Sequence, residues 1–254
     1  MYFYEIYITV IFALLGAVAA SFINAFALRR AQGKSNLEGR SMCPKCGKTL
    51  SWYELIPVFS WLILFGKCRG CKNPISPRYL ITEVIGAAAS ALVFVRFGLT
   101  PITPLVFAVF VIIFAIALID LTETEIPNGL IIALIPLAVG AVWLQPDVTI
   151  LSRGIGFFAV SVPMLILALI ISGAFGGGDI KLMAVCGFLL GWQGVLLSTF
   201  IAVLTGGFLA VYLLIAKKAS KGAKIPFGPH LCFGVYASLL YGDRIISLYI
   251  NLFF

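Results

Sequence analysis

Charged residues are scarce in this sequence. They make up 11% of the 254 residues, whereas 61% of the residues are hydrophobic and the mean hydropathy is +1.09. A soluble domain of this length does not need so much apolar surface, so the composition excludes an ordinary soluble globular protein and makes lipid part of the solvent. The sequence also has no repeat of 20 to 50 residues and no low-complexity tract, which excludes repeat architectures.

Several local signals are missing as well. No basic segment precedes the first apolar run, Ile6 to Leu28, so we expect a membrane-spanning helix there rather than a cleaved leader. No Gly-x-Gly-x-x-Gly motif is present, so the residues themselves indicate no cofactor site. The single histidine, His230, stands at the expected start of a helix, where a lone histidine is usually structural, and we leave it out of catalysis.

The apolar residues are gathered into runs. A helix needs roughly 17 to 25 such residues to cross a bilayer. The sequence predicts an all-α polytopic membrane protein with about eight transmembrane helices, at residues 5–28, 80–97, 102–120, 129–145, 154–172, 180–192, 194–216 and 230–250. The sixth run is short, which leaves open a half-helix or a re-entrant segment.

The basic residues are unevenly distributed between the loops. Ten of the eighteen Lys and Arg residues fall between Arg29 and Arg78, and four more precede Pro226. If the loop 29–79 is cytoplasmic, the N-terminus lies outside, fifteen basic residues lie inside and three lie outside. Those three are Arg96, Arg153 and Arg244. Such a bias is typical of cytoplasmic loops in a membrane protein, and we expect no nucleic-acid partner.

This topology brings two aspartates to the same side of the bilayer. Asp120 ends the third run, and Asp179 precedes the sixth after three glycines, Gly176 to Gly178. Carboxylates at the border of membrane spans are costly and indicate function. Two of them brought together share one proton and can act as base and acid on a peptide bond. Taken singly, Asp120 could cap a loop and Asp179 could cap a helix, and an ion relay is a further alternative.

The polar segment after the first run carries two Cys-x-x-Cys pairs. Cys43 and Cys46 form the first, and Cys68 and Cys71 form the second. Two such pairs offer the four thiolates of a structural zinc site, and the predicted cytoplasmic location favours zinc over two disulfides. We therefore expect a cytoplasmic zinc-binding insert after the first helix, folded by its metal.

Seven segments in order along the chain resemble the type IV prepilin leader peptidases, membrane aspartic proteases of the GxGD kind. They are Ala20–Asn24 with Arg29-Arg30, Arg40–Cys46, Ile56–Leu62, Cys68–Cys71 followed by Ile75–Tyr79 and Glu83, Asp120 with Glu125–Asn128, Gly176–Leu182 and Ile225–Pro229. They extend over most of the chain, which makes a chance likeness improbable.

The resemblance implies more than the residues show by themselves. Asp120 and Asp179 would be the catalytic residues of a bacterial inner-membrane enzyme that cleaves prepilins or pseudopilins after the Gly that ends a basic leader. Residues 1–98, with the cysteine insert, would carry N-methylation by S-adenosylmethionine, and residues 99–254 would form a six-helix peptidase core. By its position in the family pattern, Glu83 would belong to the methylation site.

Three further charged residues have two interpretations each. Glu123 and Glu125 would attract a basic leader or would simply form a solvated acidic loop. Lys181 would act on a nearby carboxylate or would extend to the membrane interface.

Overall fold

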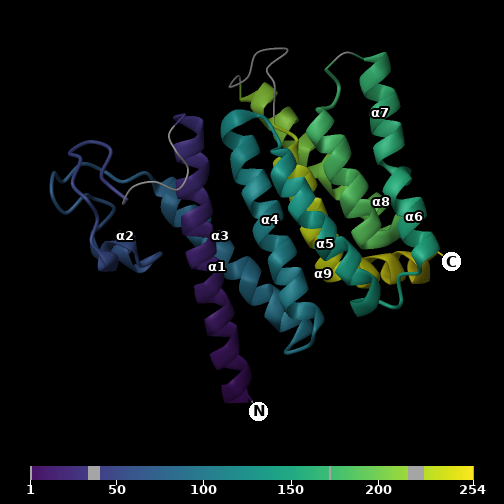
Figure 1. Cartoon of the computed structure of the whole chain (residues 1–254), viewed down its shortest axis with the longest axis horizontal. Helices are drawn as coiled ribbons and strands as arrows, with labels where there is room; N and C mark the ends of the chain where they lie inside the picture. Colours follow the sequence, from purple (N-terminus) through teal and green to yellow (C-terminus); the bar gives the residue numbers. More distant parts are fainter. Residues whose placement is uncertain (1, 34–40, 172, 217–225, 254) are drawn as a thin grey trace. The chain divides into compact units, whose positions relative to one another are not determined.

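The computed structural model describes residues 2–33, 41–171, 173–216 and 226–253 (Figure 1). These residues form helices and, apart from two isolated β-bridges, no strands, which confirms the all-α prediction. They divide into two compact units, Met1–Thr100 and Pro101–Phe254. Some of the residues used in the sequence predictions lie outside the described part of the chain, namely Lys34, Arg40, Lys217, Lys218, Lys221, Lys224 and Ile225.

Two long helices form the body of the first unit. They are α1 (Tyr2–Ala31) and α3 (Pro77–Phe97), and between them lies the polar insert with the short helices η1 (Trp52–Leu55) and α2 (Phe59–Ile63). A Cβ atom at Gly86 would overlap the side chain of Ala20, and one at Gly16 would overlap Ser90. Small residues therefore let α1 and α3 pack closely, as membrane helices do.

The second unit holds the other six helices of the described chain. They are α4 (Ile102–Glu123), α5 (Asn128–Leu144), α6 (Ile150–Ala159), α7 (Ser161–Ile170), α8 (Gly177–Ile215) and α9 (Gly228–Phe253). The sequence predicts a single helix where α6 and α7 occur. The two are separated only at Val160, and together they form one apolar segment of 21 residues.

Helix α8 reverses direction at Gly191. This residue has φ 74° and ψ 174°, a conformation that side chains other than glycine's rarely allow. Before the reversal Gly178 lies against Ile126, and after it Gly206 lies against Phe227. Because Ile126 follows α4 and Phe227 precedes α9, both ends of α8 return to the same end of the bundle, which we call the aspartate end.

The reversal accounts for the predicted number of spans. By length and composition, six helical segments of the described chain can cross a membrane, and α5 is a shorter apolar helix. Helix α8 is one of the six, but it consists of two apolar legs on either side of Gly191. With both legs and α5 counted, the described chain has the predicted eight apolar helical segments. The sixth predicted span is a regular helical leg that runs from Gly177 to this turn.

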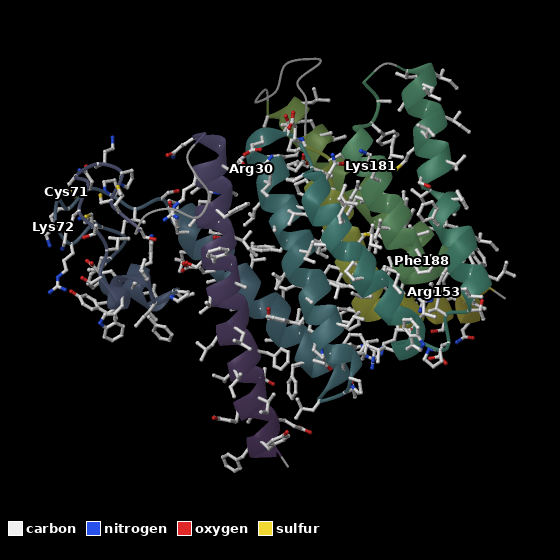
Figure 2. The ribbon with its side chains drawn as sticks, viewed as in Figure 1. Arg30, Cys71, Lys72, Arg153, Lys181 and Phe188 are labelled. Carbon is white, nitrogen blue, oxygen red and sulfur yellow. The ribbon has the colours of Figure 1, made fainter. Side chains whose placement is uncertain are left out.

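A buried arginine closes the opposite end of the second unit. Arg153 of α6 is fully buried, although its sequence context predicts a position in a loop. Figure 2 shows it beside Phe188, at the other end of the unit from Lys181. The guanidinium donates hydrogen bonds to carbonyl oxygens at the ends of α5 and of the first leg of α8, namely those of Ala141, Gln145, Phe188 and Leu189. It also donates to the carbonyl of Val148, in the loop before α6. A cation is favourable there because helix C-termini carry partial negative charge.

Replacing Arg153 is expected to destabilise the second unit. In Arg153→Met the carbonyl groups lose their donor while they remain buried, and each unsatisfied group costs about 1–3 kcal/mol. We expect the midpoint of thermal unfolding in detergent to fall by roughly 5–10 °C. Arg244→Met is the matched control, because Arg244 is exposed. Equal midpoints for the two variants would contradict the role given to Arg153.

Candidate functional site

Asp120 lies in the last turn of α4 and is buried, with 5% of its surface exposed. The helix ends just after it because Thr124 adopts a left-handed conformation, φ 55° and ψ 34°. The backbone N–H of Thr124 donates to the carbonyl of Asp120 at 2.9 Å. Asp120 therefore still lies within the helix, on the face of α4 that is buried in the bundle.

The first residue of α9 holds this carboxyl group. The backbone N–H of Gly228 donates to Oδ2 of Asp120 at 3.0 Å. A Cβ atom at position 228 would lie 2.7 Å from the same oxygen, so only glycine permits this approach. The N-terminus of a helix carries partial positive charge, which favours an anion at this place.

Asp179 stands at the start of α8 and is partly buried. Its Oδ2 accepts a hydrogen bond from the backbone N–H of Gly176 at 3.1 Å. This contact caps the helix, as one interpretation of the sequence allowed. The carboxylates of Asp120 and Asp179 are also close enough to interact electrostatically. The structure therefore brings the two predicted residues together, each with one oxygen held by a glycine N–H.

The loop that follows Asp120 packs onto the helix that bears Asp179. A Cβ atom at Gly178 would lie 2.8 Å from Cβ of Ile126, which explains a glycine at that position. Lys181 Nζ donates to Oδ1 of Asn128 at 3.1 Å. Lys181 therefore joins α8 to the first residue of α5, a contact that neither interpretation of the sequence anticipated.

Residues before α8 and α9 also meet at this end. The rings of Phe175 and Phe227 have their centroids 5.9 Å apart. His230 Nδ1 lies 3.2 Å from the hydroxyl of Thr205, which agrees with a structural histidine. The contact of Gly228 with Asp120 was not predicted from the sequence. The signal available was the Phe227-Gly228-Pro229 motif, which indicates a special backbone without identifying its partner.

In the first unit, the four cysteines of the insert converge. All four Sγ atoms lie within 4.8 Å of one another, and those of Cys43 and Cys71 are 3.9 Å apart. Zinc–sulfur bonds of about 2.3 Å in a tetrahedron place sulfur atoms roughly 3.8 Å apart, whereas a disulfide bond requires about 2.0 Å. The cluster fits a tetrahedral Cys₄ metal site and not a pair of disulfides.

Each Cys-x-x-Cys pair forms a tight turn closed by backbone hydrogen bonds. Gly47 N donates to the carbonyl of Cys43, and Lys72 N donates to that of Cys68, both at 2.9 Å. Gly47 and Lys72 have positive φ values, 70° and 60°. The two turns therefore have the same construction, which presents two thiols from each side.

The environment favours thiolates at two of these cysteines. Backbone hydrogen bonds, first that of Cys46, lower the pKa of the Cys43 thiol. The backbone and then the side-chain amide of Asn73 lower the pKa of Cys71 to about 6. A backbone contact from Lys48 lowers the pKa of Cys46, but burial and the neighbouring thiols outweigh it and raise that pKa to about 11. A bound cation would hold all the thiols in their anionic form.

Glu83 connects α3 to the insert. It is buried, and its Oε2 accepts a hydrogen bond from the backbone N–H of Val58 at 2.7 Å. Val58 precedes α2 and has a positive φ of 65°. In this structure Glu83 therefore fixes an unusual backbone conformation at the start of α2, and a part in methylation stays a prediction.

Metal analysis tests the cysteine site. The purified protein is expected to contain about one zinc ion per chain, and Cys71→Ser to contain less than about half of that, because three thiolates bind zinc more weakly than four. Mass spectrometry of the metals gives the ratio. Cys186→Ala is the control, since Cys186 is buried in α8. A zinc content unaffected by Cys71→Ser would refute the assignment.

Comparison with known proteins gives consistent matches. Residues 14–97 match the Bacterial Peptidase A24 N-terminal domain, and residues 105–211 match the Type IV leader peptidase family. A prepilin leader peptidase/N-methyltransferase of Bacillus subtilis (strain 168) is 33% identical over 240 residues, which cover 94% of this chain and 96% of the relative.

Two further relatives carry the same name. The protein of Pseudomonas aeruginosa is 33% identical over 83% of this chain and 74% of its own length. That of Aeromonas hydrophila is 32% identical over 84% of this chain and 76% of its own length. No solved structure matches the chain. The helical membrane architecture, the paired aspartates and these relatives agree: the chain belongs to the type IV leader peptidase family and is an enzyme with peptidase and methyltransferase activity.

Proposed function

We propose that the protein is an aspartic endopeptidase that cleaves the basic leader of type IV prepilins or pseudopilins after a Gly residue. It then methylates the new N-terminal amine with S-adenosylmethionine. The names of the relatives support the substrate class and both activities. The observation that supports the aspartic mechanism is that Asp120 and Asp179 lie at the same end of the bundle, within electrostatic reach of each other.

Two carboxyl groups that a substrate brings within a few ångströms of each other share one proton, because both cannot ionise there. The ionised group accepts a proton from water, and the oxygen of that water attacks the carbonyl carbon of the scissile peptide. The protonated group gives its proton to the carbonyl oxygen. When the tetrahedral intermediate collapses, the C–N bond breaks and the leaving amine takes the proton that the base had accepted. One hydroxyl of the intermediate returns its proton to the group that had acted as acid, so that the C=O bond re-forms and the pair again holds one proton.

The hydrogen bonds of the site orient both carboxyl groups for these proton transfers. Gly228 N–H holds one oxygen of Asp120, and Gly176 N–H holds one oxygen of Asp179. The second oxygen of each is then available to the water and the substrate. Because the donors are backbone groups at helix starts, they need not reorganise during the reaction.

Acidic residues beside Asp120 suit a basic substrate. Glu125 is exposed and Glu123 is partly buried, and both follow the end of α4. Their negative charge attracts the basic leader and favours a register that brings the peptide after it to the carboxyl pair.

We assign methylation to residues 1–98 and peptide cleavage to residues 99–254. The cysteine cluster would hold zinc, which there supplies folding energy to a small insert. Glu83, through its hydrogen bond to Val58, ties that insert to α3 and would keep the methylation site in shape.

We further propose that the enzyme lies in the bacterial inner membrane with its N-terminus outside and its active site at the cytoplasmic face. The support is the distribution of basic residues, fifteen against three, under that topology. The aspartate end of the second unit is then cytoplasmic.

Substitution of the aspartates tests the mechanism. We expect Asp120→Asn and Asp179→Asn each to lower the rate of prepilin cleavage by at least about 10³-fold, because the proton shared by the pair is lost. Gel mobility of a purified prepilin follows the reaction. Methylation of a substrate that already lacks its leader should continue, and omission of S-adenosylmethionine should abolish methylation while cleavage remains. Cleavage that survives in both variants would refute the aspartic mechanism.

A second prediction concerns Gly228. In Gly228→Ala the added methyl group meets Asp120 Oδ2 at 2.7 Å and displaces the carboxyl group. We expect kcat for cleavage to fall by about 10²-fold with a smaller change in KM, because orientation rather than binding is lost. Gly207→Ala is the control, since a Cβ atom there meets no atom within 4 Å. Equal kinetics of the two variants would contradict the contact.

A further inference from the structure

A buried asparagine on α1 has an unused donor. The side chain of Asn24 is fully buried, and its Oδ1 accepts a hydrogen bond from Nε of Arg78 on α3 at 3.1 Å. Because a guanidinium can only donate, this contact fixes which end of the amide is oxygen. Nδ2 of Asn24 is therefore a donor, and it has no hydrogen-bond partner among the described residues.

Arg78 also has an unused buried donor. Nη2 of Arg78 is buried and has no partner in the described part of the chain. Arg78 also forms no ion pair with any described carboxylate. Its Nε is used by Asn24, so that this hydrogen-bonded pair presents one unused NH₂ group from each residue. Buried donors without an acceptor are rare in proteins and call for an explanation.

The surroundings are positively charged. The hydroxyl of Tyr79 lies within electrostatic reach of both Arg78 and Arg29. Arg29 Nη2 lies 3.5 Å from Oγ of Ser41, at the start of the insert. Glu83 is an acidic residue of the same helix, α3, but its Oε2 accepts a hydrogen bond from Val58 N–H. An anionic acceptor is thus the group that this cluster lacks.

We propose that Asn24 and Arg78 form an oxyanion-binding site and that its ligand is the α-carboxylate of S-adenosylmethionine. Two N–H donors on adjacent planar groups match the two oxygens of a carboxylate. The choice of this ligand rests on the methyltransferase function proposed above. The phosphate of an anionic lipid headgroup offers the same chemistry, but the full burial of Asn24 favours a small ligand that enters the protein.

The variant Asn24→Asp separates binding from folding. The new carboxylate still accepts the hydrogen bond from Arg78 Nε, which it strengthens by an ion pair, so the contact between α1 and α3 is kept. The free donor, however, becomes a negatively charged oxygen that repels a carboxylate. Arg78→Lys is the second variant, because it keeps the charge and loses the planar donor.

Binding of two compounds to the full-length protein in nanodiscs tests the proposal by calorimetry. The compounds are S-adenosylmethionine and its decarboxylated form, which lacks only the α-carboxylate. We expect the wild type to bind S-adenosylmethionine at least ~10-fold more tightly, and both variants to lose most of that preference. The decarboxylated compound should bind wild type and variants alike. Ser90→Ala is the control, because its hydroxyl is another buried donor without a partner among the described residues of α3.

The nanodiscs contain phosphatidylcholine with or without phosphatidylglycerol, which distinguishes the two sources of the oxyanion. Variants that retain less phosphatidylglycerol but bind S-adenosylmethionine as the wild type does would overturn the carboxylate assignment in favour of a lipid. Variants identical to wild type in both measurements would overturn the site itself while the methyltransferase function stands. A wild type that binds neither compound would overturn the methyltransferase function and this proposal with it, whereas cleavage would be unaffected.

Discussion

The hydrogen bond between Gly228 N–H and the buried carboxyl group of Asp120 is the contact on which the second unit depends. A carboxyl group inside an apolar bundle needs a polar partner, and here the partner is the first N–H of α9. The contact forces the end of α4 and the beginning of α9 together. It also requires a glycine, because any side chain at position 228 would occupy the space of the carboxyl oxygen.

At each end of this unit, a charged side chain complements the partial charge of the helix ends, with opposite signs at the two ends. At the aspartate end, carboxyl groups meet the N–H groups at the starts of α8 and α9. At the other end, Arg153 meets the carbonyl groups at the ends of α5 and of the first leg of α8. Each charge therefore complements the partial charge of the helix ends beside it. In lipid, where water cannot satisfy these groups, such pairing fixes how the helices are joined.

The sequence allowed most of the spans to be predicted, because a run of apolar residues has one stable arrangement in a bilayer. It also predicted that Asp120 and Asp179 lie at the same end of the helices and that the four cysteines cluster, since topology and spacing determine both arrangements. It did not predict that Arg153 is buried, because five of its six acceptors are backbone carbonyls, which have no sequence signature. Nor did it predict that Glu83 binds the N–H of Val58, since that contact depends on an unusual backbone conformation 25 residues away.

The turn at Gly191 determines on which side of the bilayer the chain lies after α8. Because α8 doubles back there, an even number of crossings separates Asp179 from Gly228. Both residues can then lie on one side and serve one site. If α8 were a continuous rod, the number of crossings would be odd. Gly228 would then lie on the opposite side from Asp120 and could not donate to it, and α9 would have the opposite orientation in the membrane. The sidedness of the whole carboxyl-terminal region thus depends on the backbone conformation of one residue.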